Sequence, residues 1–350
     1  MKKIILFLIV FIPLSAFSQA KTNTVFQFLK LSNSPRIEGS GGENISLYND
    51  DLTMALNNPA LLNSSMTKKV SVNYAGYFKE IKSGATGFAY EHEKYGIFAI
   101  GINYFSYGKF AGFDETGVST GEFKASDYAF NLLYAKDLFK NFRAGINFKN
   151  IISQYEIYKS YGIAFDLGLN YRTENDFSFA LCGKNIGTQI KPYYKGHYEK
   201  LPFDLQAGVS KKLAHAPFTL SITAHNLHKP NLSYDLPYGN DITIFDTGTE
   251  KENGKFINFL DNSLRHIVLG VEFSPIKSFY FNLGYNHKMK KEMTIYNKSG
   301  IIGISWGFGL KLKKFQIAYS RSKYHFAGGV NNFSITLNLD KLKGISKENE

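Results

Sequence analysis

The feature that most constrains this chain is a period-two pattern of side chains that recurs from Lys69 to Leu339. In the stretch YGIAFDLGLNY, Phe165 and Leu167 alternate with small or polar residues such as Asp166. Alternate side chains of a strand point to opposite faces, so each such segment has one apolar face and one small or polar face. Aromatic residues make up 16% of the chain, which also suits strands. The pattern therefore predicts an all-β fold.

The pattern divides into fourteen predicted strands separated by turn residues. They span residues 69–78, 84–92, 95–107, 124–135, 141–153, 159–172, 176–185, 201–211, 216–226, 264–274, 277–287, 299–312, 313–323 and 331–340. Short connections such as HEK and RTEND alternate with long ones, among them 108–123, 186–200 and 227–263. Long loops on one rim and short turns on the other are typical of an outer-membrane barrel.

The alternative fold is a soluble β-sandwich, whose strands also have one apolar face. A sandwich would carry Lys, Glu and Thr on the opposite face, whereas this face is rich in Gly, Ala, Ser and Asn. Small residues suit a crowded lumen in which another segment lies close to the wall. Segments of about ten residues also match tilted spanning strands. We therefore predict a fourteen-stranded antiparallel transmembrane outer-membrane barrel over residues 69–340.

The N-terminal residues differ from the rest of the chain. MKKIILFLIVFIPLSAFS, residues 1–18, has two lysines, an apolar run and a small-residue cleavage site, which predicts a signal peptide. Residues 19–68 lack the strand pattern. A barrel of fourteen strands has a lumen too wide for wall side chains to fill, so this segment is predicted to plug it. Residues 341–350 are predicted to be a periplasmic tail.

The sequence contains no constellation that indicates catalysis, and no enzyme activity, cofactor or metal is predicted. Charged residues on the predicted lumenal face are expected to pair across the lumen or to hold the plug; they are Arg143, Lys149, Asp166, Lys184, Asp204 and Glu272. His225 and His266 flank the longest loop, but two histidines without a third ligand are a weak metal signal. The formal charge of +12 is scattered over turns and strand ends, so nucleic acid is not an expected partner.

The N-terminal segment also carries a family resemblance. FLKLSNSPRIEGSGGENISLYNDDLTMALNNPALLN, residues 28–63, resembles the opening of the PorQ family, outer-membrane components of the type IX secretion system of Bacteroidota. Other similar pieces are TGEFKASDYAFNLLYA, YKSYGIAFDLGLNY and RHIVLGVEF. The resemblance, which extends to the related PorV proteins, implies a barrel of the FadL long-chain fatty-acid transporter class. It also implies that the plug contains the family's Asn-Pro-Ala motif and the two leucines after it, here Asn58, Pro59, Ala60, Leu61 and Leu62.

The same resemblance implies a structural protein that anchors a PorZ-like surface partner of the sortase attachment complex, next to outer-membrane lipid and lipopolysaccharide. The loops would then bind the partner through aromatic anchors; the candidates are Tyr193, Tyr194, Tyr234, Tyr238, Phe245 and Phe256. One alternative is a PorV-like cargo shuttle. Another is FadL-like passive transport of hydrophobic molecules, which requires an apolar pocket whose candidate lining is Phe26, Phe28, Leu29, Leu31 and Leu52.

Overall fold

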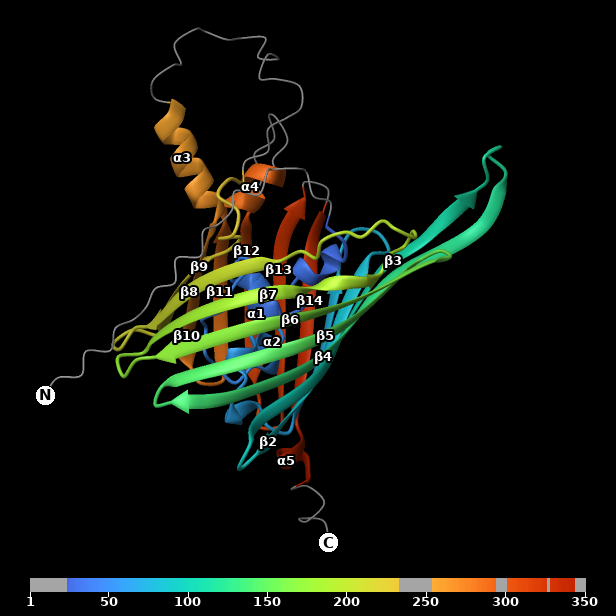
Figure 1. The fold of residues 1–350 in the computed structure, drawn as a ribbon. Coiled ribbons are helices and arrows are strands. Elements are labelled where there is room, and N and C mark those ends of the chain that lie inside the picture. The colour runs from blue at the N-terminus through green and yellow to red at the C-terminus, as the bar shows by residue number, and fades with distance from the viewer. Residues whose placement is uncertain (1–23, 233–253, 294–300, 326–327, 344–350) are drawn as a thin grey trace, which may run out of the picture.

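The computed structural model describes residues 24–232, 254–293, 301–325 and 328–343, and within them fourteen strands close into one antiparallel barrel (Figure 1). Each strand pairs with its neighbours in sequence, and β1 pairs with β14 to close the sheet. The strands are β1 (Lys69–Gly76), β2 (Lys82–His92), β3 (Gly96–Phe113), β4 (Ser119–Phe139), β5 (Phe142–Tyr155), β6 (Tyr158–Arg172), β7 (Phe177–Lys191), β8 (Asp204–Lys212), β9 (Phe218–Ala224), β10 (Ile267–Ile276), β11 (Phe279–Asn286), β12 (Ile304–Lys311), β13 (Phe315–His325) and β14 (Gly328–Asn338). The predicted fourteen-stranded antiparallel barrel is confirmed.

The two faces of the wall differ as the period-two pattern predicts. In β6, Phe165 points outward and is 37% exposed, whereas Asp166, the next residue, points into the lumen and is 0% exposed. The outward face carries many exposed apolar side chains, among them Ile100, Leu132 and Ile335. An apolar surface of this extent is stable against lipid rather than against water. The core of the molecule is therefore the lumen, and it is lined with small and polar residues.

Two predicted loops are partly strand. Residues 186–191, predicted as the start of a loop, belong to β7, which continues to Lys191. Residues 108–123, predicted as a loop, are largely strand, because β3 continues to Phe113 and β4 starts at Ser119. Bulges near Ser106 and Gly112 shift the alternation, so a strict period-two pattern does not detect these strands. Residues 108–123, called the hairpin arm below, extend beyond the other strands at the upper right of Figure 1.

The barrel has two different rims. The short-turn rim carries the start of β1 and the end of β14, which is followed by α5 (Leu339–Lys343). The long-loop rim carries α3 (Gly254–Arg265) and α4 (His287–Met293), at the top of Figure 1. In outer-membrane barrels the short turns face the periplasm and the long loops face outward. Among the described helices, none is long and apolar enough to cross a membrane.

The N-terminal segment, residues 24–66, lies inside the barrel and is drawn in blue in Figure 1. It contains α1 (Pro35–Gly39), α2 (Leu52–Ala55) and 3₁₀ turns at Gln27–Lys30, Pro59–Leu61 and Ser64–Met66. The side chain of Ser34 caps the start of α1, and Gly41 and Gly42 adopt positive φ just after its end. The predicted signal peptide, residues 1–18, lies outside the described residues, as do residues 344–350 of the predicted tail.

Candidate functional site

The Asn-Pro-Ala motif lies against two glycines of the wall. Asn58 is fully buried; its side-chain oxygen accepts a hydrogen bond from the Ala60 amide at 3.0 Å, and its side-chain amide donates to the Ile45 carbonyl at 2.7 Å. A Cβ added to Gly145 or Gly168 would come within 2.6 or 2.9 Å of the Ala60 nitrogen. Because these glycines lack side chains, the backbone of the motif touches the backbone of the wall.

The four motif residues after Asn58 are buried as well. Pro59 is the first residue of a 3₁₀ turn, where its fixed φ fits and its missing N–H is not needed. Leu61 packs in a cluster with Ile37 and Met54 of the same segment, whereas Leu62 packs in a cluster that includes Leu133 of the wall. The motif therefore connects the inner packing of the N-terminal segment to the barrel.

Glu272, predicted to face the lumen, binds a residue that the sequence did not single out. The Arg36 guanidinium donates from Nε and Nη2 to the two Glu272 carboxylate oxygens, at 2.8 and 2.6 Å. The guanidinium also lies over the ring of Tyr280, with 4.1 Å between Cζ and the ring centroid. Both charged side chains are buried, so the pair ties α1 to β10 in a region of low dielectric.

Three further predicted lumen charges lie close together: Asp166 and Lys184 at a bulge between β6 and β7, and Lys149 on the adjacent β5. The bulge places Lys184 and Asn185 opposite Asp166 and turns both of them inward. Lys149 forms an ion pair with Asp166 at 2.7 Å and donates to the Asn185 side-chain oxygen at 2.8 Å. Lys184 donates to the side-chain oxygen of Asn57, in the N-terminal segment. The structure thus brings Lys149 and Asp166 together within the wall and directs Lys184 to the segment.

The last two predicted lumen charges, Arg143 and Asp204, bind different parts of the molecule. Arg143 donates from Nε and Nη2 to Asp137, at 2.7 and 2.6 Å, and from Nη1 to the Leu62 carbonyl at 2.7 Å. Asp204 accepts hydrogen bonds from the Gln206 side chain and the Asn226 amide, each at 2.6 Å. Arg143 therefore holds the end of the N-terminal segment, whereas Asp204 orders the wall and the start of the loop after β9.

Asp50 holds the N-terminal segment at the short-turn rim. It forms ion pairs with Lys69 at 3.1 Å and with Lys311, which start β1 and end β12. Burial alone would raise the pKa of the Asp50 carboxyl, but the two ammonium groups outweigh burial and hold the pKa well below its usual range. Asp50 thus links the N-terminal segment to β1 and to β12, two strands on either side of the pair β13 and β14.

The first residues of the N-terminal segment pack differently, in an apolar cluster near the long-loop rim. Phe26, Phe28 and Leu29 contribute to it, and Leu31 packs against it; Leu52 lies in another cluster nearer the short-turn rim. That these residues line an apolar pocket stays a prediction. The other members come mainly from the wall and the loop before β8; they include Phe105, Ala129, Ile151, Ala164 and Leu201, with Tyr77, Ile81, Tyr107 and Tyr193 packed against them. This cluster is called the outer apolar cluster below.

The two tyrosines predicted as partner anchors in the loop after β7 point in different directions. Tyr194 is 57% exposed, as an anchor would be. Tyr193 instead packs against the outer apolar cluster, and its hydroxyl is hydrogen-bonded to Ser153. Tyr193 is therefore half-buried, and its hydroxyl is engaged within the barrel; the partner-binding role of both tyrosines stays a prediction.

The remaining predicted anchors fall where the chain is not described. Tyr234, Tyr238 and Phe245 lie outside the described residues, and Phe256 lies in α3 but its side chain is likewise not described. On the described turns of α3, Phe259, Leu260 and Leu264 are exposed.

A buried acidic network was also missed at the sequence level. Asp127 is 0% exposed and accepts hydrogen bonds from the hydroxyls of Tyr107 at 2.7 Å, Tyr155 at 3.1 Å and Ser153. Tyr193 extends the network through Ser153. The sequence signal that could have revealed this network is the position of Asp127, two residues before Ala129 and therefore on the same inward face of β4. The network places hydroxyl groups along one side of the outer apolar cluster.

The two histidines beside the longest loop meet, as expected from their positions. The His225 amide donates to the His266 carbonyl at 2.9 Å, and the His266 Nδ1 lies 2.9 Å from the His225 carbonyl oxygen. Burial, together with the positive charge of Lys288, lowers the pKa of His225 to about 4. Within the described ranges no group of three or more His, Cys, Asp or Glu side chains is placed to hold a metal ion.

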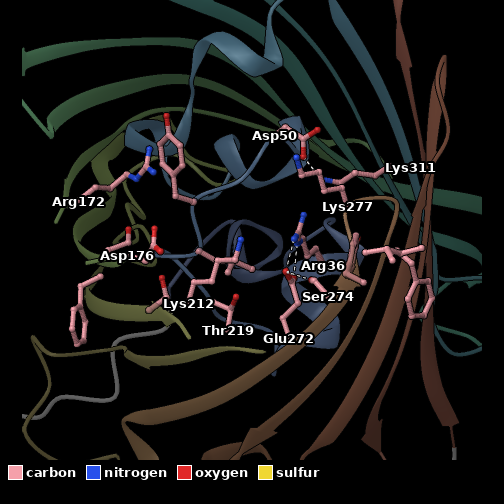
Figure 2. Close-up of a pocket in the computed structure, with 18 residues that line it drawn as sticks. Arg36, Asp50, Arg172, Asp176, Lys212, Thr219, Glu272, Ser274, Lys277 and Lys311 are labelled. Carbon is pink, nitrogen blue, oxygen red and sulfur yellow. Dashed lines mark hydrogen bonds and ion pairs between the residues drawn. The ribbon is translucent and has the colours of Figure 1, made fainter. Parts of the chain in front are cut away.

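A cavity of about 520 Å³ opens at the short-turn rim (Figure 2). Its lining comes from the N-terminal segment and from β6 to β12, and it is rich in charged residues. Figure 2 shows Arg172, Asp176 and Lys212 on one side of the cavity and Arg36 beside Glu272 on the other. No local sequence pattern indicates this cavity, because its walls come from segments far apart along the chain.

No family model matches the chain, and no curated protein matches it. Solved structures do match. A TodX variant described as a monoaromatic hydrocarbon channel has a TM-score of 0.52 at 9% identity, over 87% of this chain and 98% of that one. The CymD monoaromatic hydrocarbon channel has a TM-score of 0.51 at 12% identity, over 89% and 98%. The P. putida toluene transporter TodX has a TM-score of 0.51 at 8% identity, over 89% and 99%.

At these identities the matches show the fold. The protein shares its barrel fold with these three solved structures, which are described as channels or transporters. The coverage is nearly complete on both sides, so the similarity extends over the whole barrel rather than a few strands.

Proposed function

We propose that this protein is an outer-membrane channel for the passive movement of small hydrophobic molecules, exported by the signal peptide of residues 1–18 and plugged by its N-terminal segment. The observation that carries the proposal is the outer apolar cluster, which places an apolar zone inside the barrel near the long-loop rim. An apolar solute gains free energy on leaving water for such a zone. The fold shared with the toluene and monoaromatic hydrocarbon channels adds support.

In this proposal the solute displaces residues 24–31. They are held by apolar contacts and by one backbone hydrogen bond, from the Val25 amide to the Lys200 carbonyl at 3.0 Å. Among the described residues no ion pair ties this stretch to the wall, in contrast to Arg36 and Asp50 further along. A solute that replaces the contacts of Phe26 and Phe28 with its own apolar surface therefore moves the stretch at low cost.

The test is to lock this stretch to the wall and to measure uptake. Thr24 and Lys200 form a β-bridge, which brings their Cα atoms within the range that a disulfide spans. In a Cys182→Ser background, Thr24→Cys/Lys200→Cys is expected to block uptake of labelled toluene by cells that lack the native gene. Reductant is expected to restore it, and each single cysteine variant serves as a control. Uptake by the oxidised double variant at the level of the single variants would overturn the proposal.

A second candidate function is docking of a surface protein, and the hairpin arm is the observation that favours it. Phe113 and Val118 are 64% and 61% exposed there, and the rings of Phe110 and Phe123 stack at 5.4 Å. Neither strand of the arm pairs with a third strand beyond Ser106 and Ala125, so both edges are open to a partner. The partner would be a PorZ-like protein of a type IX attachment complex, bound next to lipopolysaccharide.

Removal of the arm separates the two functions. Replacement of residues 110–123 by a two-residue Asn-Gly turn, which leaves the paired Lys109 and Lys124 on either side of it, is expected to leave toluene uptake unchanged if the protein is a channel. If docking is its function, the same change releases a specific surface protein into the medium, and uptake is the same with and without the gene.

A further inference from the structure

We propose that the cavity at the short-turn rim binds a phosphate-bearing anion. Its volume of about 520 Å³ falls within the usual range of ligand pockets. Cationic side chains outnumber carboxylates in its lining: Arg36, Arg172, Lys212, Lys277 and Lys311 stand against Asp50, Asp176 and Glu272. The proposal is independent of the channel function, because it requires no movement of the N-terminal segment.

Two of the three carboxylates are already neutralised. Glu272 is bound by Arg36, and Asp50 is bound by Lys69 and Lys311. Three cations remain that have no carboxylate within ion-pair distance in the described part of the chain, Arg172, Lys212 and Lys277. Among the residues that line the cavity, Asp176 is the one carboxylate left to offset the charge of these three cations. The mouth of the cavity therefore has an excess of positive charge that attracts anions.

The inner end of the cavity contains buried donors without partners. Arg36 uses Nε and Nη2 on Glu272, and its Nη1 has no hydrogen-bond partner although the residue is only 4% exposed. The hydroxyl of Tyr280 is buried without a partner as well. Buried donors without acceptors are costly. An anion oxygen at this end would accept from both groups, while the exposed cations bind the rest of the anion.

The ligand chemistry follows from the donor types. Guanidinium, ammonium and hydroxyl groups together are typical of phosphate sites, and the lining hydroxyls are Ser178, Ser210, Thr219 and Ser274. A neighbouring cavity of about 180 Å³ shares Asp50 and Lys311 and adds Lys69, Lys313, Lys314 and Lys341. Two adjoining basic cavities suit an anion with more than one phosphate group.

The site admits a soluble anion from the aqueous side and a lipid headgroup from the membrane side. Phe177 and Ile276 belong to the lining and are exposed on the rim, so the cavity reaches the edge that meets the inner leaflet.

Inorganic pyrophosphate is the simplest probe of the phosphate chemistry that a soluble anion and a lipid headgroup share. Its binding to the full-length protein in neutral detergent is measured by titration calorimetry at low salt, where screening is weak.

The diagnostic variant is Lys212→Gln/Lys277→Gln, which changes two exposed side chains and leaves the buried pair intact. We expect it to weaken pyrophosphate binding about tenfold or more, because each charge-assisted hydrogen bond is strong. Asp176→Asn should instead strengthen binding severalfold, and Asn tolerates the positive φ of 59° at this position. The matched control is Lys159→Gln/Lys195→Gln, which removes the same charge from exposed positions near the long-loop rim and should leave binding unchanged.

Nanodiscs identify the source of the anion. If phosphatidylglycerol nanodiscs weaken pyrophosphate binding relative to phosphatidylcholine nanodiscs in the wild type but not in Lys212→Gln/Lys277→Gln, the site takes a lipid headgroup. Equal binding in both nanodiscs assigns a soluble anion. Absence of saturable binding in all media, or equal losses in the diagnostic and control variants, overturns the proposal.

Discussion

The two ends of the N-terminal segment are held in the barrel by different interactions. Toward the short-turn rim, residues 35–66 press their backbone onto wall glycines such as Gly145 and bind wall charges such as Glu272. Near the long-loop rim, residues 24–31 make apolar side-chain contacts. Backbone packing and buried ion pairs depend steeply on position, whereas apolar contacts are non-directional.

The two kinds of contact indicate which part of the N-terminal segment is able to move. Displacing residues 35–66 would strand the Glu272 carboxylate in a buried site and leave backbone groups such as the Leu62 carbonyl without the donor Arg143. Displacing residues 24–31 exposes apolar surface that a hydrophobic solute covers again. The short-turn half is therefore the fixed part of the plug, and the long-loop half is the part that moves.

The largest expected effect is the loss of the buried ion pair. Glu272→Leu leaves the Arg36 guanidinium buried without its partner, which should lower the free energy of unfolding by about 3–5 kcal/mol. Arg36→Met/Glu272→Leu should lose much less than Glu272→Leu alone, because no charge is left unpaired. Urea unfolding in detergent, followed by the fluorescence of Trp306, measures both.

Glu122→Gln is the control, because it breaks the exposed pair with Lys109 and should cost less than about 1 kcal/mol. If Glu272→Leu proves as mild as Glu122→Gln, the short-turn half is not fixed by this pair.

The next effect concerns backbone contact. Gly145→Ala places a methyl group against the backbone of Pro59 and Ala60, and should cost about 1–3 kcal/mol in unfolding free energy. Gly76→Ala is the matched control, because the nearest atom to its new Cβ lies 3.9 Å away, on Tyr74. Equal urea midpoints for the two variants would show that the motif does not rest on the wall.

A smaller effect is expected at the other end of the segment. Phe28→Ala removes a buried ring, but residues 24–31 open locally rather than through global unfolding, so the unfolding free energy should fall by only about 1 kcal/mol. Limited proteolysis should cut this stretch faster in the variant than in the wild type. A loss of global stability as large as that of Gly145→Ala would contradict the proposed difference between the ends.

The smallest effect is a pH dependence at the long-loop rim. The pKa of His225, about 4, is below the value of an unfolded histidine, so the unfolded state binds more protons between the two values and stability falls as the pH falls. Between pH 7 and pH 6 the loss should be about 0.7 kcal/mol. Urea midpoints at the two pH values measure it. His225→Gln should remove the part of the dependence that His225 contributes, whereas His215→Gln, at an exposed histidine of a short turn, should keep it.

Much of the barrel was predictable from sequence because it rests on local patterns. The alternation around Phe165 and Asp166 is a property of neighbouring residues. It determines which side chain faces lipid, whichever strand β6 pairs with. Turn residues likewise mark short connections locally. The hairpin arm escaped prediction because bulges break the local period while the pairing of β3 with β4 continues.

The contacts that define the candidate sites were decided by the tertiary structure. Arg36 and Glu272 are 236 residues apart, and only barrel closure with a particular register places them together. The inward turn of Tyr193 and the cavity between the short turns have the same origin. The alternation of side chains was enough to predict a membrane-spanning barrel whose inner wall is small and polar, because face and period are local properties. What occupies that lumen, and which charges are left unpaired at its rim, depends on long-range contacts that no local pattern encodes.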